Sequence, residues 1–189
     1  MVDSFKSCYA VITNVIHTDR FIKWNNGNHY CAILNVDESC LGSLVRAGYG
    51  GVVRNYADFY LSGFAGYIND SSDNLYAELY AIYLSLILAK SLNITELVCY
   101  YDSLLCINLL KGPTLRFHVY AVLIQDVKDL IEEYTVTICH TLREGNQCGN
   151  FLAKLGASSD NELLLHASPP EALLPLLQMD AAGTFYSRE

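Results

Sequence analysis

The order of predicted strands and helices along residues 31–157 constrains the fold of this chain most strongly. Apolar and β-branched runs alternate there with helical periodicity and turn residues. The short turn at 55–58 makes the second and third strands an antiparallel hairpin. The order β-β-β-α-β-α-α-β-α predicts an α/β fold with a five-stranded mixed sheet flanked by helices. The predicted bounds are 31–38, 48–54, 59–67, 73–92, 95–101, 103–110, 119–132, 134–140 and 147–157.

Two flanking segments complete the predicted organisation into one domain with tails. Residues 1–30 form an N-terminal lead-in, which contains the turn cluster 25–28 and Trp24 as a candidate anchor. Residues 158–189 contain Pro169, Pro170 and Pro175 and are predicted to be an apolar C-terminal extension. The segment between them, 31–157, is the predicted folded domain.

Composition restricts the classes of partner. Hydrophobic residues make up 52% of the chain, which is enough for one core, and the formal net charge is −8. This charge argues against binding nucleic acid through a broad basic surface. It leaves room for a local nucleic-acid site, because a bound metal ion supplies positive charge of its own.

The seven cysteines indicate an intracellular protein, nuclear or cytoplasmic. Their number is odd, no two have CxxC spacing, and we expect reduced, buried thiols. Cys139, His140 and Cys148 lack a fourth zinc ligand. No apolar stretch approaches the roughly 20 residues of a membrane span, so no membrane partner is expected.

Three carboxylates lie where different predicted elements could bring them together. Asp37 lies near the end of the first strand, Glu78 one turn inside the first helix, and Asp102 directly after the fourth strand. Carboxyl ends of parallel strands are common places for sites in α/β folds. A single aspartate there is usually a cap or turn residue, but three converging carboxylates are typical ligands of Mg²⁺.

The residues around these carboxylates carry a family resemblance. From Trp24 to Ala157 the chain closely resembles the ribonuclease H type 1 domain, in the divergent form of plant non-LTR retrotransposons and their reverse-transcriptase-associated relatives. The motifs, in order, are LNVDES (34–39), GYGG (48–51), AEL (77–79), YDS (101–103), REGNQC (143–148) and FLAKLGA (151–157).

The resemblance implies an endonuclease that hydrolyses the RNA strand of RNA–DNA hybrids with two Mg²⁺ ions, or Mn²⁺ in their place. Asp37, Glu78 and Asp102 match its metal-binding catalytic carboxylates, and His140 matches a mobile histidine that assists water activation or product release. One ion would prepare the nucleophile, and the other would stabilise the leaving 3′-oxygen. The hybrid would be recognised through its 2′-hydroxyls and minor groove.

The chain departs from the family pattern at the metal site. Asn150 stands where the family has a fourth aspartate, so it keeps a carbonyl oxygen without charge and is expected to be a weak metal ligand. Glu38 replaces a glycine and adds bulk and negative charge near the expected path of the nucleic acid. Because neighbours in a strand face opposite sides, Glu38 is not expected to join Asp37 as a ligand.

The expected substrate-binding residues also differ from the family. Residues 41–46 replace its Gly-Asn-Pro-Gly turn, leaving Ser43 as a hydroxyl donor and Arg46 as a phosphate contact. Asn146 in the REGNQC motif is the third expected substrate-binding residue. The glycines at 48–51 open a strand rather than a helix, which indicates close packing or a turn and not a phosphate loop.

Two functions follow from this pattern. The retained Asp37, Glu78, Asp102 and His140 favour a hybrid-cleaving ribonuclease, weakened by its departures. Asn150, Glu38 and the altered turn favour a catalytically inactive ribonuclease H-like module of retroelement origin, which binds nucleic acid or protein. The oligomeric state is left open.

Overall fold

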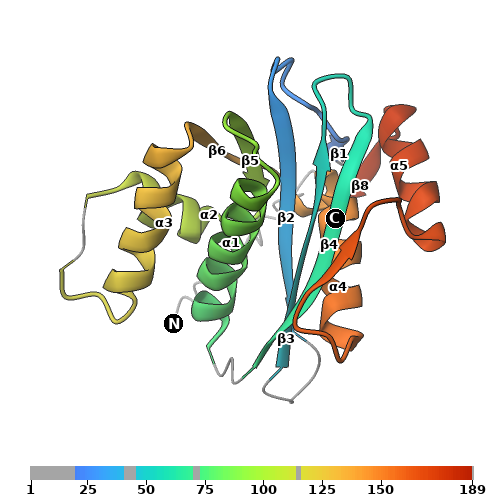
Figure 1. Cartoon of the computed structure of the whole chain (residues 1–189). Helices are drawn as coiled ribbons and strands as arrows, with labels where there is room; N and C mark the ends of the chain where they lie inside the picture. The colour runs from blue at the N-terminus through green and yellow to red at the C-terminus, as the bar shows by residue number, and fades with distance from the viewer. Residues whose placement is uncertain (1–19, 41–45, 70–72, 114–115, 189) are drawn as a thin grey trace, which may run out of the picture.

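The computed structural model describes residues 20–40, 46–69, 73–113 and 116–188. Within them, a mixed sheet has the strand order β6-β5-β2-β3-β4-β7 (Figure 1). Its strands are β2 (Ala32–Cys40), β3 (Arg46–Arg54), β4 (Tyr60–Asn69), β5 (Leu97–Tyr101), β6 (Val136–His140) and β7 (Leu164–His166).

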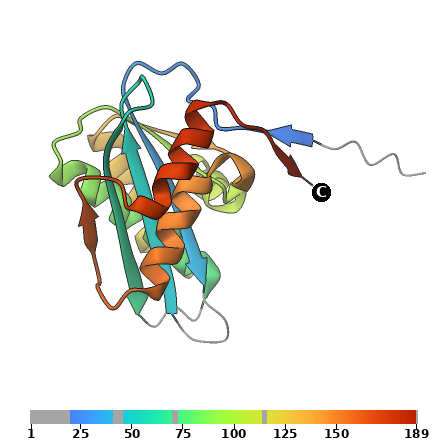
Figure 2. The same ribbon diagram turned by 90° about the vertical axis from the view of Figure 1, so that its right-hand side faces the viewer.

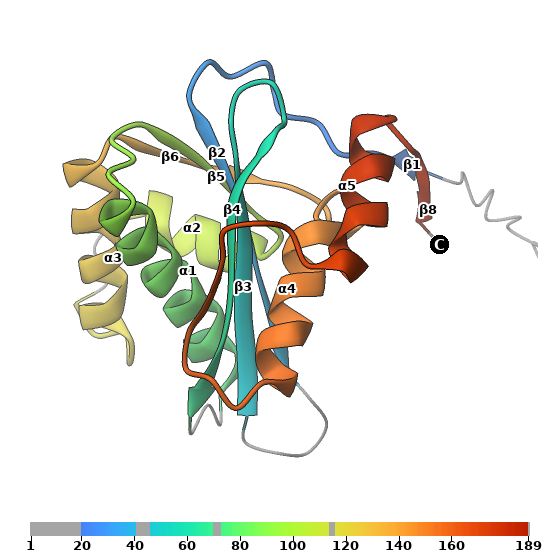
Figure 3. The same cartoon turned by 45° about the vertical axis from the view of Figure 1, so that its right-hand side comes forward.

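Helices cover both faces of this sheet. One face carries α1 (Asn74–Ser91), α2 (Leu104–Lys111) and α3 (Ala121–Glu133), as Figure 3 shows. The other carries α4 (Gln147–Ser158) and α5 (Leu174–Ala181), preceded by the 3₁₀ turns η1 (Arg143–Gly145) and η2 (Glu171–Leu173). The largest core cluster lies on the α1 side, where Leu34 and Val36 of β2 pack with Leu79 and Ile82 of α1.

The predicted fold class is confirmed. β2, β3 and β4 pair antiparallel, whereas β5 pairs parallel with both β2 and β6, so the sheet is mixed. All five predicted strands and the four helices between 73 and 157 are present in the predicted order. The sheet gains a sixth strand, β7, from the C-terminal extension. Its three residues are too few to show the alternation by which strands are predicted.

Glycines let α4 lie directly on the sheet. A Cβ atom on Gly48 would meet the backbone of Ala157, and one on Gly50 would meet the backbone of Leu152. Of the two roles predicted for the 48–51 glycines, close packing or a turn, close packing is confirmed, since these residues lie inside β3. Since Gly50 is the cross-strand partner of Asp37, this packing also fixes α4 beside Asp37.

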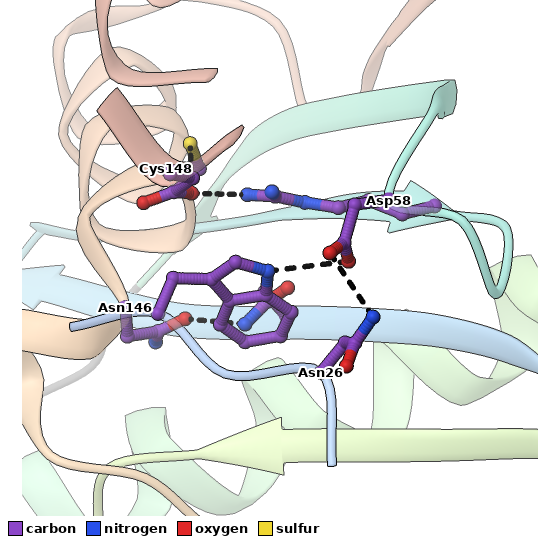
Figure 4. A network of polar contacts seen from close by, with 8 residues as sticks. Asn26, Asp58, Asn146 and Cys148 are labelled. Carbon is purple, nitrogen blue, oxygen red and sulfur yellow. Dashed lines mark hydrogen bonds and ion pairs between the residues drawn. The ribbon is translucent and has the colours of Figure 1, made fainter. Parts of the chain in front are cut away.

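The two flanking segments contact the rest of the fold and each other. β1 (Arg20–Ile22) pairs antiparallel with β8 (Tyr186–Arg188), in a ribbon that projects from the body (Figure 2). Deeper inside, Arg54 of β3 forms a buried ion pair with Asp180 of α5 at 2.6 Å, and the Cys148 thiol also donates to Asp180. The Arg54 guanidinium lies over the Trp24 ring at 4.9 Å, and Figure 4 shows this network.

Trp24 acts as the anchor expected for the lead-in. Its indole Nε1 donates to Asp58 Oδ1 at 3.2 Å, and Asn26 donates to the other oxygen of that carboxylate (Figure 4). The six cysteines within the described residues are free thiols, as predicted. The expected burial holds for Cys99, Cys106 and Cys148 but is wrong for the exposed Cys40, and Cys31 and Cys139 are only partly buried. None of the described helices is both long enough and apolar enough to span a membrane.

Candidate active site

Asp37, inside β2, and Asp102, directly after β5, lie side by side on neighbouring parallel strands. Asn35 pairs with Tyr100, so both aspartates come two residues later along their chains. The two carboxyl groups are close enough for the charge of Asp102 to raise the pKa of Asp37, so a single negative charge on the pair is favoured when no cation is present. Asp37 is only 2% exposed, and its Oδ2 receives no hydrogen bond from any described donor. Burial, and then the charge of Asp102, raises the pKa of Asp37 to about 8.

Two glutamates extend this pair into one acidic cluster. The pKa of Asp102 is raised by its own burial and by the charge of Glu78. Burial raises the pKa of Glu38, and the charges of Glu78 and Asp102 raise it further. Glu38 was not expected to be a ligand, but its charge raises the pKa of Asp37 and so acts on this group of carboxylates. We call Asp37, Glu38, Glu78 and Asp102 the acidic cluster.

The N-terminal turn of α2 holds the Glu78 carboxylate. Ser103 Oγ donates to Glu78 Oε2 at 2.6 Å, and Cys106 Sγ donates to the same oxygen from 3.2 Å. Ser103 also caps α2, since it accepts from the backbone N–H of Cys106. The serine of the YDS motif thus orients Glu78 toward Asp102.

Arg143 is a candidate functional residue that the sequence pattern alone does not indicate. Its positive charge lowers the pKa values of Asp37, Glu38 and Asp102, so it lies close to most of the acidic cluster. Its position in the REGNQC motif was visible, but a single arginine in a loop is usually solvated. Only the fold shows that η1 lies against the carboxylates.

His140 is the last residue of β6 and pairs with Tyr101. Its ring Nε2 lies 3.1 Å from the backbone oxygen of Asp102, and the side chain is exposed. The histidine is therefore adjacent to the acidic cluster. Within the described part of the chain, turning the ring toward a substrate requires breaking this hydrogen bond to Asp102.

Asn146 and Asn150 lie one turn apart at the start of α4. Asn146 is 1% exposed, donates to the Val36 carbonyl at 2.8 Å and accepts from Asn35. Since its polar atoms are engaged with β2, this arrangement gives Asn146 a positioning role and leaves no exposed group for the substrate. Asn150 is 8% exposed, and its Oδ1 receives no hydrogen bond from the described residues. Along α4 it lies between Asn146, which contacts Val36, and Leu152, which contacts Gly50, the cross-strand partner of Asp37.

The other expected substrate residues lie away from the acidic cluster or outside the described part of the chain. Ser43 belongs to residues 41–45, which the structure does not describe. Arg46 is four residues along β3 from Gly50, the partner of Asp37, which corresponds to about 13 Å. It pairs with Asp160 at 3.3 Å and stacks on the Tyr67 ring. Arg46 is therefore engaged in local contacts.

The carboxylates supply some, but not all, of the ligands expected for a divalent cation. Among the described residues, no group of three or more His, Cys, Asp or Glu side chains is arranged to hold a metal ion. The Asp37–Asp102 pair does offer two hard oxygen donors, with a buried acceptor that has no protein donor. Asn150 adds a second buried acceptor without a donor nearby. These three side chains suit one divalent ion, and Glu78 is held by Ser103 and Cys106.

We predict that the metal-free protein loses stability as the pH rises from about 4 to 8. Asp37 binds a proton in the folded state up to a pKa of about 8 but loses it near 4 when unfolded, so the unfolded state binds fewer protons across this range. The free energy of unfolding should fall by roughly 2–4 kcal/mol. This is less than the full pKa difference would give, because Asp102 shares the proton. Urea titrations at several pH values with a chelator test this. An increase in stability over the same interval would contradict it.

Known proteins place this arrangement in a family. The model of the reverse transcriptase-like family matches residues 35–156. The chain belongs to the reverse transcriptase-like family. The family match contains all four residues of the acidic cluster together with His140 and Asn150. The resemblance inferred from the sequence is thereby confirmed. No curated protein sequence matches the chain.

Solved structures confirm the ribonuclease H fold for this family member. RNase H1 of Halobacterium salinarum has a TM-score of 0.60 and 18% identity, covering 67% of this chain and 97% of its own. The RNase H domain from Mycobacterium tuberculosis has a TM-score of 0.58 and 23% identity, covering 67% and 93%. LC11-RNase H1 from compost, solved with an RNA/DNA hybrid, has a TM-score of 0.59 and 19% identity, covering 67% and 96%.

Proposed function

We propose that this protein is a ribonuclease that hydrolyses the RNA strand of RNA–DNA hybrids with the help of divalent metal ions. The observation that carries the proposal is the buried Asp37–Asp102 pair, whose Oδ2 acceptor on Asp37 has no protein donor. A buried carboxyl pair of this kind is costly unless a cation or a proton compensates it. Membership of the reverse transcriptase-like family and structural likeness to hybrid-bound LC11-RNase H1 support the same reading.

The chain's own residues have separable tasks in this reaction. Asp37, Asp102 and, through its carbonyl oxygen, Asn150 would hold the cation, while Ser103 keeps Glu78 directed at the same region. When bound, a divalent cation supplies positive charge at the scissile phosphate and acidifies water. Arg143 adds positive charge beside the carboxylates. His140, exposed next to Asp102, would move a proton to or from the reacting oxygens.

Asn150 should make the site weak. A fourth carboxylate would add a full negative charge beside Asp37, and the amide supplies only a dipole. We predict that Asn150→Asp raises Mn²⁺ affinity by about 10–100-fold, the range typical of changes around metal ligands, and raises the cleavage rate in parallel. Calorimetric titration with Mn²⁺ measures the affinity. Asn161→Asp, which adds the same charge at an exposed turn, is the control, and equal affinity in both variants would contradict the prediction.

The proposed activity is tested with an end-labelled RNA strand annealed to DNA, incubated with Mg²⁺ or Mn²⁺. The RNA in the hybrid should be cut, whereas the DNA strand and the same RNA alone should stay intact. Circular dichroism must show a folded protein in the same sample. Intact hybrid RNA at high protein concentration would refute the proposed ribonuclease activity.

A second candidate is a catalytically inactive nucleic-acid-binding or protein-interaction module. Two observations favour it: the uncharged Asn150, and the lack among the described residues of a three-ligand metal group. Binding of the hybrid without cleavage in both metals would select this candidate. The Asn150→Asp variant then serves as the second readout, because restored cleavage indicates a site that lost activity through this residue.

A further inference from the structure

A basic arm formed by the two ends of the described chain lies beside the acidic cluster. We define the terminal arm as residues 20–23 and 185–188, whose strands β1 and β8 pair antiparallel and project from the body (Figure 2). The arm is seated on η1, because a Cβ atom on Gly145 would meet the Lys23 carbonyl at 3.3 Å and Ile22 Cγ2 at 3.7 Å. Arg143, whose charge acts on the acidic cluster, belongs to the same turn. The arm thus has a defined position next to the site.

The terminal arm carries positive charge, whereas the chain as a whole is negatively charged. Arg20, Lys23 and Arg188 are exposed, and so is the neighbouring Arg143, in a chain with a net charge of −8 and 12 Lys and Arg residues. These four residues are therefore a third of all its basic residues. Two exposed aromatic rings lie among them, Phe21 and Phe185, and Lys23 Nζ lies 5.2 Å from the centre of the Phe185 ring.

The two arginines of the ribbon face each other. Arg20 and Arg188 are direct partners across β1 and β8. Like charges in this position destabilise a strand pair, and a ribbon of three residues per strand has little to offset that cost. Glu144 compensates one of them incompletely, with its Oε1 3.7 Å from Arg188 Nε. A bound anion would remove the remaining repulsion.

A cavity connects the arm with the acidic cluster. Its volume is about 540 Å³, and its lining includes Arg188 from the arm, Arg143 from η1, and both Asp102 and His140 from the candidate active site. Glu144 also lines the cavity, beside Arg188, so the cavity brings two arginines into one space with the candidate active site. Arginines next to a metal-dependent site suit a phosphate backbone that runs from a binding surface into that site.

We propose that the terminal arm binds the phosphate backbone of a nucleic-acid duplex and holds it against the acidic cluster. The proposal rests on the proposed function for its occupant, an RNA–DNA hybrid, and assigns binding to residues outside the matched family segment 35–156. It also reconciles an acidic chain with a polyanionic substrate, because the positive charge is concentrated at the site. The contacts are to phosphates, so recognition by the arm is independent of sequence.

The test is hybrid binding followed by fluorescence anisotropy in a chelator, where no cleavage occurs, between about 50 and 200 mM salt. Arg20→Gln with Arg188→Gln should weaken binding about 10-fold and reduce the slope of log affinity against log salt by roughly 1–2. Lys111→Gln with Lys154→Gln removes the same charge from exposed positions elsewhere and should change affinity less than about 2-fold. Equal loss in both double variants, or no loss in the arm variant, overturns the proposal.

Further outcomes separate the arm from catalysis. If the wild type binds the hybrid through the arm but does not cleave it, the arm stands and the ribonuclease proposal fails. If the arm variant cleaves the hybrid with unchanged KM, the proposal that the arm binds the hybrid fails, and the proposal of ribonuclease activity stands. A wild type that does not bind the hybrid at low salt overturns the arm as well. Should the double variant melt early, Lys23→Gln, with an expected loss of about 2–3-fold, replaces it.

Discussion

Asp37→Asn is expected to lower the rate of hybrid cleavage by about 10²–10³-fold, the range seen when one electrostatic contact to a reaction centre is removed. Asp37 is the most buried member of the acidic cluster, and its Oδ2 is the acceptor without a donor. The asparagine keeps the shape of the side chain but removes the charge that would hold a cation. Cleavage should be measured at saturating hybrid and several Mn²⁺ concentrations.

The same substitution should stabilise the protein when metal is absent. At pH 8 the wild type holds a buried carboxyl whose ionisation is opposed by burial and by Asp102, and an amide removes that penalty. Lower activity with higher metal-free stability is a combination that simple misfolding cannot produce. Asp126→Asn, an exposed change on α3, is the matched control and should alter neither quantity. Reduced stability of the Asp37 variant would contradict this account of the site.

Asp180→Ala is expected to destabilise the protein by about 3–5 kcal/mol, because it leaves the Arg54 guanidinium buried without its counter-charge. The side chains of Arg54 and Asp180 are only 2% and 3% exposed, and Arg54 already has one nitrogen, Nε, without a partner in the described structure. Urea unfolding measures the loss, which should appear as a lower midpoint with an unchanged m-value.

Two further variants isolate the ion pair as the cause. Asp160→Ala breaks the exposed Arg46–Asp160 pair, where Asp160 is 98% exposed, and should cost no more than about 1 kcal/mol. Arg54→Met combined with Asp180→Leu removes both charges and should recover most of the stability. If the double variant is as unstable as Asp180→Ala, packing of α5 rather than the buried charge explains the loss.

The sequence predicted the elements whose signals are local. Periodicity located the helix that carries Glu78, and Asp73 caps that helix with a 2.8 Å hydrogen bond from the Leu75 N–H. The positions of Asp37 and Asp102 near the ends of predicted strands predicted that the two carboxylates would lie close together. The glycines at 48 and 50 were expected to allow either close packing or a turn, and only the packing of α4 on them shows which of the two applies.

Features that depend on distant contacts could not be predicted in this way. Arg54 lies in an apolar strand with nothing nearby to reveal that its partner, Asp180, lies 126 residues away. Asn146 looked available to a substrate because its bonds to Asn35 and Val36 form only when α4 packs on β2. β1 and β8 have three residues each and are recognisable as strands only because they pair with each other from opposite ends of the described chain.

The chemical identity of the cleaved RNA ends tests the central claim most directly. If the acidic cluster directs water at the scissile phosphate, the 3′-oxygen leaves, and the hybrid RNA is left with 3′-hydroxyl and 5′-phosphate ends. Metal-independent ribonucleases that attack through the 2′-hydroxyl leave 2′,3′-cyclic phosphates instead. Mass spectrometry of products from the wild type and Asp37→Asn distinguishes these outcomes. We predict 3′-hydroxyl ends that require Mg²⁺ or Mn²⁺ and disappear in Asp37→Asn; cyclic phosphates, or products that persist in this variant, would contradict the proposed active site.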